Sequence, residues 1–332
     1  MTAVFISHGP SALANYYGAR ALAALEAVAE VRRNPGEDAW TAETLAAAAQ
    51  GCEIIVSDRR AEGGDDLLAR LPSLVAFVRC AVDIRNVDVA AASVHGILVT
   101  RASAGFMTSV SEWIVAVMLD LSRHISAAAL QYRAGQTPAL VMGRELRGAT
   151  LGIIGYGQIG RCLADLALAF GMRVFVTDPH VSVAHAAVQQ VPMDRLLVEA
   201  DHVVCLATAS PETENLMNAA AFAAMKPSAF FINASRGGLV DEAALLEALD
   251  TRRIAACALD VGRAPDQMPS PELARHPRVI ATPHIGGLTP EAIEHQAMET
   301  VQQVTDIVSG RVPAGAVNAP HARRLQAFFD RT

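Results

Sequence analysis

The sequence predicts an α/β protein with two doubly wound parallel sheets. Short apolar runs alternate with longer segments in which apolar residues recur every three or four positions. This alternation is typical of parallel strands covered by helices on both faces. It occurs twice along the chain, and 332 residues exceed what one ordinary hydrophobic core holds. Two domains are therefore expected.

The first series of strands opens the chain. The runs AVFIS, CEIIVSD, LVAFVRC and GILVT have the length and composition of buried strands. Residues 11–31 form one continuous helical pattern after the first of them, and core packing is the expected role of Tyr16 and Tyr17. A long helix is predicted at about 109–133, where AGQTP follows as a stop signal.

The second series holds six apolar runs, ATLGIIGYG, RVFVTD, HVVCLAT, AFFINAS, IAACALDV and RVIATP. Six short strands with helices between most of them describe a complete doubly wound unit. Another long helical pattern follows at 289–310. We expect residues 104–291 to form a cofactor domain inserted into an outer domain made of 1–103 and 292–332, with the two long helices as crossovers.

Composition limits the classes of partner. The chain is 52% hydrophobic and 18% charged, as in a globular protein with a large core, and its net charge is −7. A negative charge without a Lys/Arg run argues against nucleic acid. No window approaches 18 uncharged apolar residues, and no signal peptide is recognised, so no membrane partner is expected. Five scattered cysteines without a CxxC pair indicate reduced thiols and a cytoplasmic location, with no metal site.

A glycine motif between a strand and a helix predicts dinucleotide binding. Gly155, Gly157 and Gly160 follow the run LGII, with Gln158 and Ile159 at the mouth of the helix. The first glycine permits a tight turn, the second lets the backbone approach a pyrophosphate, and the third lets helix and strand pack closely. The phosphates would meet the positive end of the helix and its free N–H groups.

Asp178 extends this motif. It ends the next strand, 18 residues after the last glycine, and no arginine lies near it in TDPHVSV. A carboxylate there accepts hydrogen bonds from the ribose 2′-OH and repels a 2′-phosphate, which predicts NAD rather than NADP. The alternative role of Asp178 is that of a solvated acid at a strand end.

With these motifs the chain resembles the D-isomer-specific 2-hydroxyacid dehydrogenases, the group that includes phosphoglycerate, formate and phosphite dehydrogenases. The specific agreement lies in LGIIGYGQIG, MKPSAFFINASRGGLVDEAALLEAL, ALDV and TPHIGG. Looser agreement extends to NVDVAAASVHGILVT and SVSEW. The resemblance implies a Rossmann NAD-binding domain inserted into a split flavodoxin-like substrate domain, and a homodimer formed through the cofactor domain.

The resemblance also assigns catalytic roles. Arg236 in SRGG would clamp a carboxylate and polarise a 2-oxo group with its guanidinium fork. His284 in TPHIGG would act as general acid and base, and Asp260 in LDV matches an acid near the nicotinamide. Most of the other histidines, including His8 and His124, are expected to be solvated or capping residues. Further cofactor contacts are implied at Thr208, Ala234, Ser235, Arg236, Asp260, His284, Gly286 and Gly287.

The acid that should partner the histidine is displaced. Relatives carry it five residues after the aspartate of LDV, where this chain has Pro265. One extra residue within GRAP would align DQMP with the family's EPLP and make Asp266 the catalytic partner. The alternatives are Gln267 as a neutral partner, or no partner.

The substrate loop also departs from the family. Its glycine-rich sequence is replaced by RCAVDIRNVD, with Ala81, Val82 and Asp83 at the positions whose backbone N–H groups would hold the substrate carboxylate. Arg101 and Phe106 replace two asparagines, and Trp113 replaces a histidine. These changes predict a partly apolar substrate, with Arg101 meeting a second anionic group. Alternatively, they repack the domain interface.

These observations predict NAD-dependent reduction of a small 2-oxo acid to its D-2-hydroxy acid, in a reversible hydride transfer. Two other functions stay open. One is oxidation of a small anion, in the manner of the formate and phosphite members. The other is an NAD(H)-sensing binding protein in which turnover has decayed.

Overall fold

The structure is a computed structural model that describes residues 1–331, except for the side chain of Asp266. The chain divides into two compact units. Unit 1 comprises Met1–Gly105 and Pro290–Thr332, and unit 2 comprises Phe106–Thr289. The second is thus inserted into the first.

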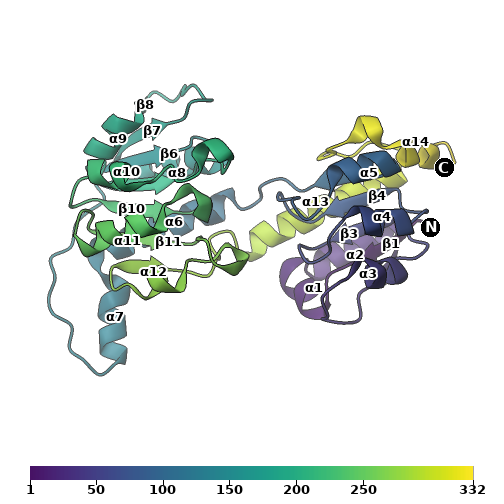
Figure 1. Cartoon of the computed structure of the whole chain (residues 1–332), viewed down its shortest axis with the longest axis horizontal. Coiled ribbons are helices and arrows are strands. Elements are labelled where there is room, and N and C mark those ends of the chain that lie inside the picture. Colours follow the sequence, from purple (N-terminus) through teal and green to yellow (C-terminus); the bar gives the residue numbers. More distant parts are fainter. Residues whose placement is uncertain (332) are drawn as a thin grey trace. The chain divides into compact units, whose positions relative to one another are not determined.

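Unit 1 contains a five-stranded parallel sheet with the order β2-β1-β3-β4-β5 (Figure 1). Its strands are β1 (Ala3–Ile6), β2 (Glu30–Arg33), β3 (Ile54–Ser57), β4 (Ala76–Arg79) and β5 (Leu98–Arg101). This is the flavodoxin-like order, in which the strand sequence reverses direction at the β1/β3 pair. Ligands of such sheets collect outside the carboxyl ends of the strands.

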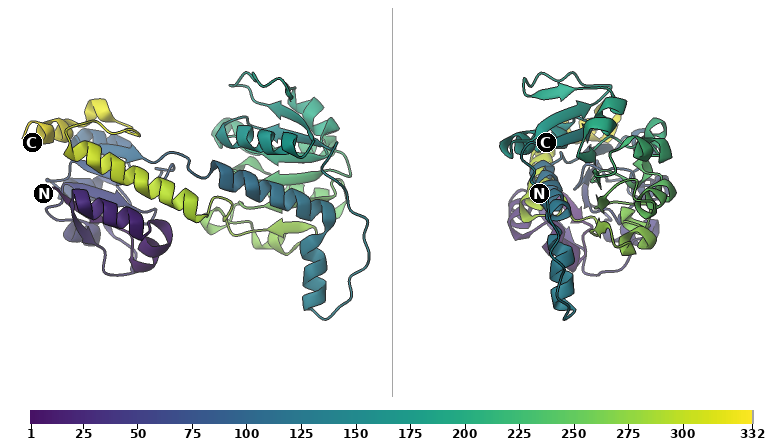
Figure 2. Two further views of the ribbon diagram at one scale, coloured as in Figure 1. Left: turned by 180° about the vertical axis from the view of Figure 1, so that it is seen from behind. Right: turned by 90° about the vertical axis from the view of Figure 1, so that its left-hand side faces the viewer.

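Helices cover both faces of this sheet. They are α1 (Pro10–Tyr16), α2 (Ala19–Val28), α3 (Ala42–Ala48), α4 (Asp65–Arg70), α5 (Val89–His95), α13 (Pro290–Val308), η4 (Ala319–His321) and α14 (Arg323–Phe329). Figure 2 shows α13, in yellow-green, beside α2, in purple. Ala297, Val304 and Ile307 of α13 are buried in one core cluster with Val4 and Ile6 of β1. The last part of the chain therefore completes a core that the first part begins.

Unit 1 differs from the prediction in four places. Tyr16 was expected in the core, but it is 48% exposed, and only Tyr17 is buried. The helical pattern of 11–31 is two helices, because Gly18 takes a φ of 86° between α1 and α2. The strand β2 was missed because its sequence EVRR is largely exposed and lacks an apolar run. His8 is not solvated, since burial leaves it 2% exposed and lowers its pKa to about 4.

Unit 2 contains a seven-stranded parallel sheet with the order β12-β11-β10-β9-β6-β7-β8. Its strands are β6 (Thr150–Ile154), β7 (Arg173–Thr177), β8 (Val188–Gln190), β9 (His202–Cys205), β10 (Phe230–Asn233), β11 (Ala256–Leu259) and β12 (Val279–Ala281). Counted from β6, the first six strands have the Rossmann order 3-2-1-4-5-6. The prediction named six of these strands and missed the three-residue β8.

Two hydrophobic clusters pack on the two faces of this sheet. The helices are α6 (Met107–Arg123), α7 (Ile125–Arg133), α8 (Gln158–Ala169), α9 (Met193–Glu199), α10 (Ala219–Ala224), α11 (Glu242–Asp250) and α12 (Pro271–Arg275). Short 3₁₀ turns lie at η1 (Pro211–Thr213), η2 (Gly237–Leu239) and η3 (Pro265–Gln267). The face that carries α6 and α8 buries Val110, Ile114 and Leu163.

The helix predicted at 109–133 is broken. His124 takes the left-handed conformation, with φ 56° and ψ 37°, and separates α6 from α7. Among the described residues no single helix is long and apolar enough to cross a membrane; α6 and α7 together have the length and composition, but they meet at a bend of 69°.

Candidate active site

The glycine turn after β6 has the geometry that a dinucleotide needs. Gly155 takes a φ of 100°, and a Cβ there would lie 2.7 Å from the backbone N of Ala207. A Cβ on Gly160 would lie 2.5 Å from the carbonyl oxygen of Gly155. Both positions therefore require glycine. A Cβ on Gly157 would meet no atom within 4 Å from the described residues beyond its neighbours in the chain and helix, so the backbone at the start of α8 is open to a ligand.

Asp178 follows β7 and is tied to the same turn. Its Oδ2 accepts a hydrogen bond from the backbone N–H of Tyr156 (2.8 Å), and its Oδ1 accepts one from the N–H of His180 (2.8 Å). The carboxylate is therefore held beside the glycine turn. Gln158, which is exposed, and Ile159, which is half-buried, begin α8 next to it.

The arginine turn follows β10 and is shaped by Asn233, which sequence reasoning did not single out. The buried side chain of Asn233 accepts from the N–H of Ser235 (3.1 Å) and donates to the carbonyl of Arg236 (2.9 Å). The Ser235 hydroxyl donates to the carbonyl of Ala207, next to the glycine turn (2.7 Å). A Cβ on Gly237 would overlap Gly262. These contacts fix the backbone from which the half-buried Arg236 side chain projects.

The histidine turn is organised by Asp260. This carboxylate is 3% exposed and accepts three hydrogen bonds, from the Thr282 hydroxyl (2.6 Å), the Ile285 N–H (2.8 Å) and the Gly286 N–H (2.7 Å). The three donors surround His284, whose backbone takes a φ of 56°. Asp260 thus holds the histidine backbone in an otherwise unfavourable conformation.

Two of the residues that depart from the family pack under this turn. A Cβ on Gly286 would lie 3.6 Å from the indole of Trp113, and one on Gly287 would lie 3.1 Å from Phe106. Trp113 and Phe106 therefore pack against the histidine turn within unit 2.

The segment predicted to hold the partner acid is a narrow loop. The Gly262 N–H donates to the carbonyl of Gln267 (2.8 Å), and the Ala264 N–H donates to the carbonyl of Met268 (3.0 Å). Gln267 has a φ of 60°, and in the described part of the chain its buried Oε1 has no hydrogen-bond partner. The side chain of Asp266 lies outside the described residues.

The predicted substrate residues lie in unit 1. In the part of the chain that the structure describes, the backbone N–H groups of Ala81 and Val82 have no hydrogen-bond partner. The Asp83 carboxylate is bonded to the guanidinium of Arg85 through Nε (3.0 Å) and Nη2 (2.6 Å). The side chain of Arg101 is exposed at the end of β5.

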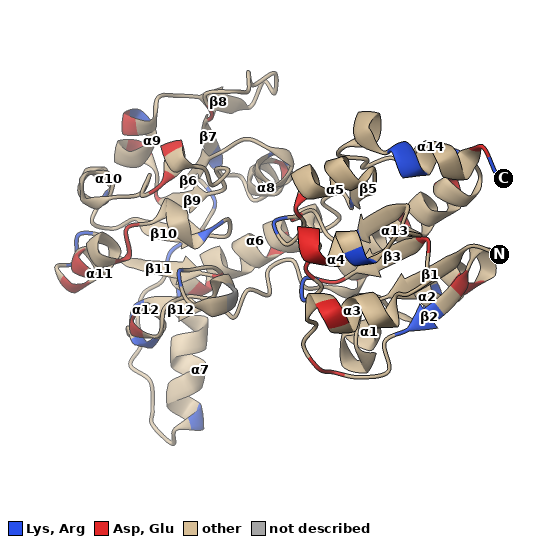
Figure 3. Cartoon of the chain, turned by 45° about the vertical axis from the view of Figure 1, so that its right-hand side comes forward, with Lys and Arg blue, Asp and Glu red and all other residues tan. Residues whose placement is uncertain are grey.

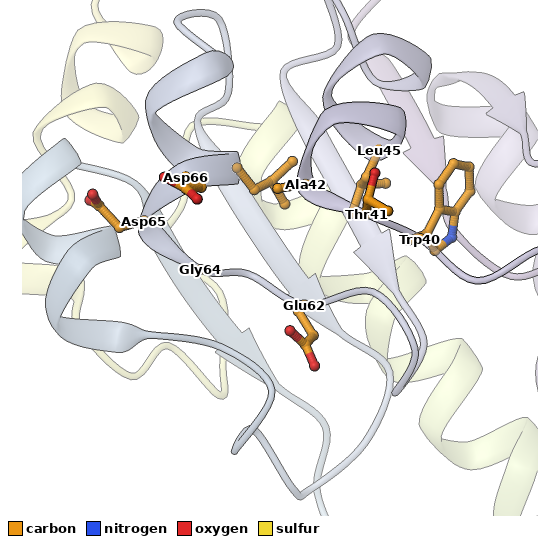
Figure 4. Close-up of a pocket in the computed structure, with 9 residues that line it drawn as sticks. Trp40, Thr41, Ala42, Leu45, Glu62, Gly64, Asp65 and Asp66 are labelled. Atoms are coloured by element: carbon orange, nitrogen blue, oxygen red, sulfur yellow. The ribbon is translucent and has the colours of Figure 1, made fainter.

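Unit 1 also has a separate pocket of about 370 Å³ between α3 and α4 (Figure 4). Figure 3 shows acidic residues on both helices. The lining includes Trp40 and the carboxylates of Glu62, Asp65 and Asp66. Asp65 is paired with His95 (2.8 Å), and Asp65 and Asp66 lie in the first turn of α4, where carboxylates stabilise a helix. Helix stabilisation accounts for Asp65 and Asp66 in the lining.

Comparisons with known proteins identify the family. Residues 115–286, about half of the chain, match the family described as D-isomer specific 2-hydroxyacid dehydrogenase, NAD binding domain. The chain is 37% identical over 246 residues to a D-3-phosphoglycerate dehydrogenase of Synechocystis, covering 73% of this chain and 44% of that protein. It is 36% identical over 260 residues to a D-3-phosphoglycerate dehydrogenase of Bacillus subtilis, covering 77% and 49%. The chain spans about half the length of the curated relatives it matches.

The fold of nearly the whole chain is similar to that of solved structures. The TT0316 protein from Thermus thermophilus superposes with a TM-score of 0.84 at 28% identity, covering 95% of this chain and 100% of that one. The apo-structure of D-lactate dehydrogenase from Escherichia coli gives 0.79 at 26% identity, covering 96% and 100%.

The chain belongs to the D-isomer-specific 2-hydroxyacid dehydrogenase family, a family of NAD-dependent oxidoreductases. The predicted family, the predicted fold and the predicted NAD cofactor are confirmed.

Proposed function

We propose that this protein reduces a 2-oxo acid to its D-2-hydroxy acid with NADH, reversibly. The observation that carries the proposal is the position of three turns in unit 2. The glycine turn follows β6, the arginine turn follows β10 and the histidine turn follows β12, and these strands are parallel. All three turns therefore lie at the carboxyl edge of one sheet, where ligands of this fold bind.

Bound NADH would supply the hydride. Gly155, Gly157 and Gly160, with Gln158 and Ile159, would hold its pyrophosphate at the start of α8. Asp178 would accept hydrogen bonds from the adenosine ribose. The remaining cofactor contacts proposed from the family motifs are Thr208, Ala234, Ser235, Arg236, Asp260, His284, Gly286 and Gly287.

The chain's own residues would bind and protonate the substrate. The Arg236 guanidinium would pair with the substrate carboxylate and polarise the 2-oxo group, since its fork matches that geometry. His284 would donate a proton to the carbonyl oxygen during reduction and remove it during oxidation. Asp260 would act on His284 through the backbone, because its carboxylate is fully engaged by the histidine turn.

The partner of the His284 imidazole is proposed to be Asp266, in the 3₁₀ turn Pro265–Gln267. Gln267 as a neutral partner, or no partner, are the alternatives. A carboxylate would raise the histidine pKa and extend reduction to higher pH, whereas a neutral group would not. The pH profile of an Asp266→Asn variant distinguishes the alternatives.

The substrate carboxylate is proposed to bind the N–H groups of the loop that holds Ala81, Val82 and Asp83. The amides of Ala81 and Val82 follow the carboxyl end of β4 and have no partner among the described residues, so they can receive an anion without losing another bond. Arg101 is proposed to meet a second anionic group. The names of the curated relatives make a phosphorylated hydroxy acid, D-3-phosphoglycerate, the second candidate substrate.

A panel of acids tests this function. NADH absorbance should fall with at least one of glyoxylate, hydroxypyruvate, pyruvate, phenylpyruvate and phosphohydroxypyruvate, and NADPH should be the poorer cofactor because Asp178 repels its 2′-phosphate. NAD reduction with D-3-phosphoglycerate would assign the second candidate substrate. Turnover only with formate or phosphite would replace the proposal with small-anion oxidation. NADH binding without any turnover would replace it with a sensor.

The protein is further proposed to be a cytoplasmic homodimer. All five cysteines are free, as in a reducing compartment. The helix α7 has no buried residue and extends away from the sheet of unit 2 (Figure 1). A nine-residue helix is marginal without packing. Its apolar side chains and those of the segment after it, Ile125, Leu130, Tyr132, Leu140, Val141 and Met142, are all more than half exposed.

The double variant Leu130→Lys/Met142→Lys should halve the mass measured by light scattering, because two charges would enter an apolar contact between copies. Val94→Lys is the matched control, since Val94 is a comparably exposed apolar residue of unit 1. A wild-type monomer, or a variant that keeps the wild-type mass, contradicts the dimer.

A further inference from the structure

Two side chains, Arg79 and Asn86, bond to each other across the two ends of the loop that would hold the substrate carboxylate, and these two ends are called its neck. Arg79 is the last residue of β4, and Asn86 lies seven residues further along the chain. The guanidinium Nε of Arg79 donates to Oδ1 of Asn86 (3.1 Å). Residues 80–85 lie between these ends, and they include the partnerless N–H groups of Ala81 and Val82.

The Arg79 end of the neck is fixed. Its side chain is only 6% exposed, and Nη1 donates to the carbonyl of Ser57 at the end of β3 (3.2 Å). The next N–H, of Cys80, donates to the same carbonyl (3.0 Å). Burial lowers the pKa of the guanidinium, and the nearby Asp58 carboxylate counteracts that effect. A buried cation of this kind persists only where its donors are engaged.

The Asn86 end is fixed to the segment that follows β3. The side-chain Nδ2 of Asn86 donates to the carbonyl of Ala61 (2.7 Å), and the backbone carbonyl of Asn86 accepts from the N–H of Gly63 (2.8 Å). Both ends of the neck are thus tied to β3 or to the residues just after it. The two ends of 80–85 are therefore fixed by contacts outside the loop itself.

We propose that Arg79 and Asn86 form a clamp that positions the substrate loop, so that the N–H groups of 80–85 are ordered before an acid binds. The proposal rests on the proposed function. Ala81, Val82 and Asp83 are half-buried in this loop. A preformed loop loses less conformational freedom on binding. Arg79 and Asn86 are positioning residues, because they act through the loop backbone.

The test compares two substitutions of one residue. Asn86→Leu removes the acceptor of the clamp at nearly constant volume, and KM for the best acid of the panel should rise about five- to tenfold, the factor that one hydrogen bond is ordinarily worth. The kcat and the dissociation constant of NADH should stay within about twofold. Asn86→Asp keeps an acceptor for Arg79 but loses the Nδ2 donor to the Ala61 carbonyl, so KM should rise by less than in Asn86→Leu.

Asn318→Leu is the matched control. Asn318 is a buried asparagine of unit 1 that bonds Val99 and Ile97, outside the clamp. If its KM rises as much as that of Asn86→Leu, the effect is general loss of stability and the clamp is refuted. An unchanged KM in Asn86→Leu also refutes it.

Hydrogen exchange separates this inference from the proposed function. Asn86→Leu should increase the exchange of the amides of 80–85, while Asn318→Leu should leave it unchanged. If the wild type reduces no acid, the proposed function fails, and the ordering of the loop is then judged by exchange alone. Equal exchange in wild type and Asn86→Leu overturns the clamp.

Discussion

Replacing His284 by asparagine is expected to lower kcat for reduction by about 10²–10⁴-fold, the range that a general acid contributes. Asparagine is chosen because it tolerates the left-handed conformation of this position, with φ 56°. The three hydrogen bonds of Asp260 to Thr282, Ile285 and Gly286 do not involve the imidazole. The turn should therefore keep its shape, and NADH binding measured by fluorescence should change less than about threefold.

His124→Asn is the control for this experiment. His124 also has a φ of 56°, and it lies between α6 and α7 in unit 2. The two variants make the same chemical change at two residues with the same φ. Wild-type kcat in His284→Asn, or an equal loss in His124→Asn, would show that the imidazole of 284 is not the proton donor.

Asp260→Asn is expected to combine a loss of stability with a loss of activity. Both carboxylate oxygens accept from donors, so an amide can satisfy only one side, and its NH₂ group must face an N–H or hydroxyl donor on the other. One unsatisfied buried pair costs about 1–3 kcal/mol of unfolding free energy. The displaced histidine turn should lower kcat about 10–100-fold. Thermal unfolding and steady-state kinetics measure the two effects.

Asp241→Asn is the control for Asp260→Asn, because it removes a carboxylate charge from unit 2 at a position away from the histidine turn. Asp241 caps α11 and accepts from the N–H of Ala244 (3.1 Å), a role that asparagine fills equally well. This variant should keep its stability and kcat. If Asp260→Asn is as stable and as active as Asp241→Asn, the three hydrogen bonds do not hold the histidine turn.

The fold was predictable wherever strands are buried on both faces, because those strands are continuous apolar runs. The strands β2 and β8 were not predicted, because edge strands contact fewer neighbours and can remain polar. The breaks at Gly18 and His124 were missed because apolar periodicity continues across a single left-handed residue. Local backbone conformation, rather than hydrophobic pattern, ends those helices.

The turns of the candidate site were predictable from sequence motifs, but the side chains that hold those turns in place were not. Asn233 is recognisable only as a polar residue at the end of a buried strand. The role of Asp260 depends on N–H groups 25 and 26 residues away along the chain. The clamp of Arg79 and Asn86 depends on carbonyls of β3 and the segment after it. Hydrogen bonds between distant segments have no sequence period, so only the folded chain reveals them.

The late position of α13 in the sequence, after all of unit 2, has a consequence for folding during synthesis. Unit 2 is one uninterrupted stretch, Phe106–Thr289, and can close its core as soon as that stretch has left the ribosome. Unit 1 completes its core later, because Ala297, Val304 and Ile307 are synthesised only after the whole of unit 2. Until then β1 and β3 present apolar surface to the cell, and a nascent chain stalled before residue 297 would be a substrate for chaperones or for aggregation.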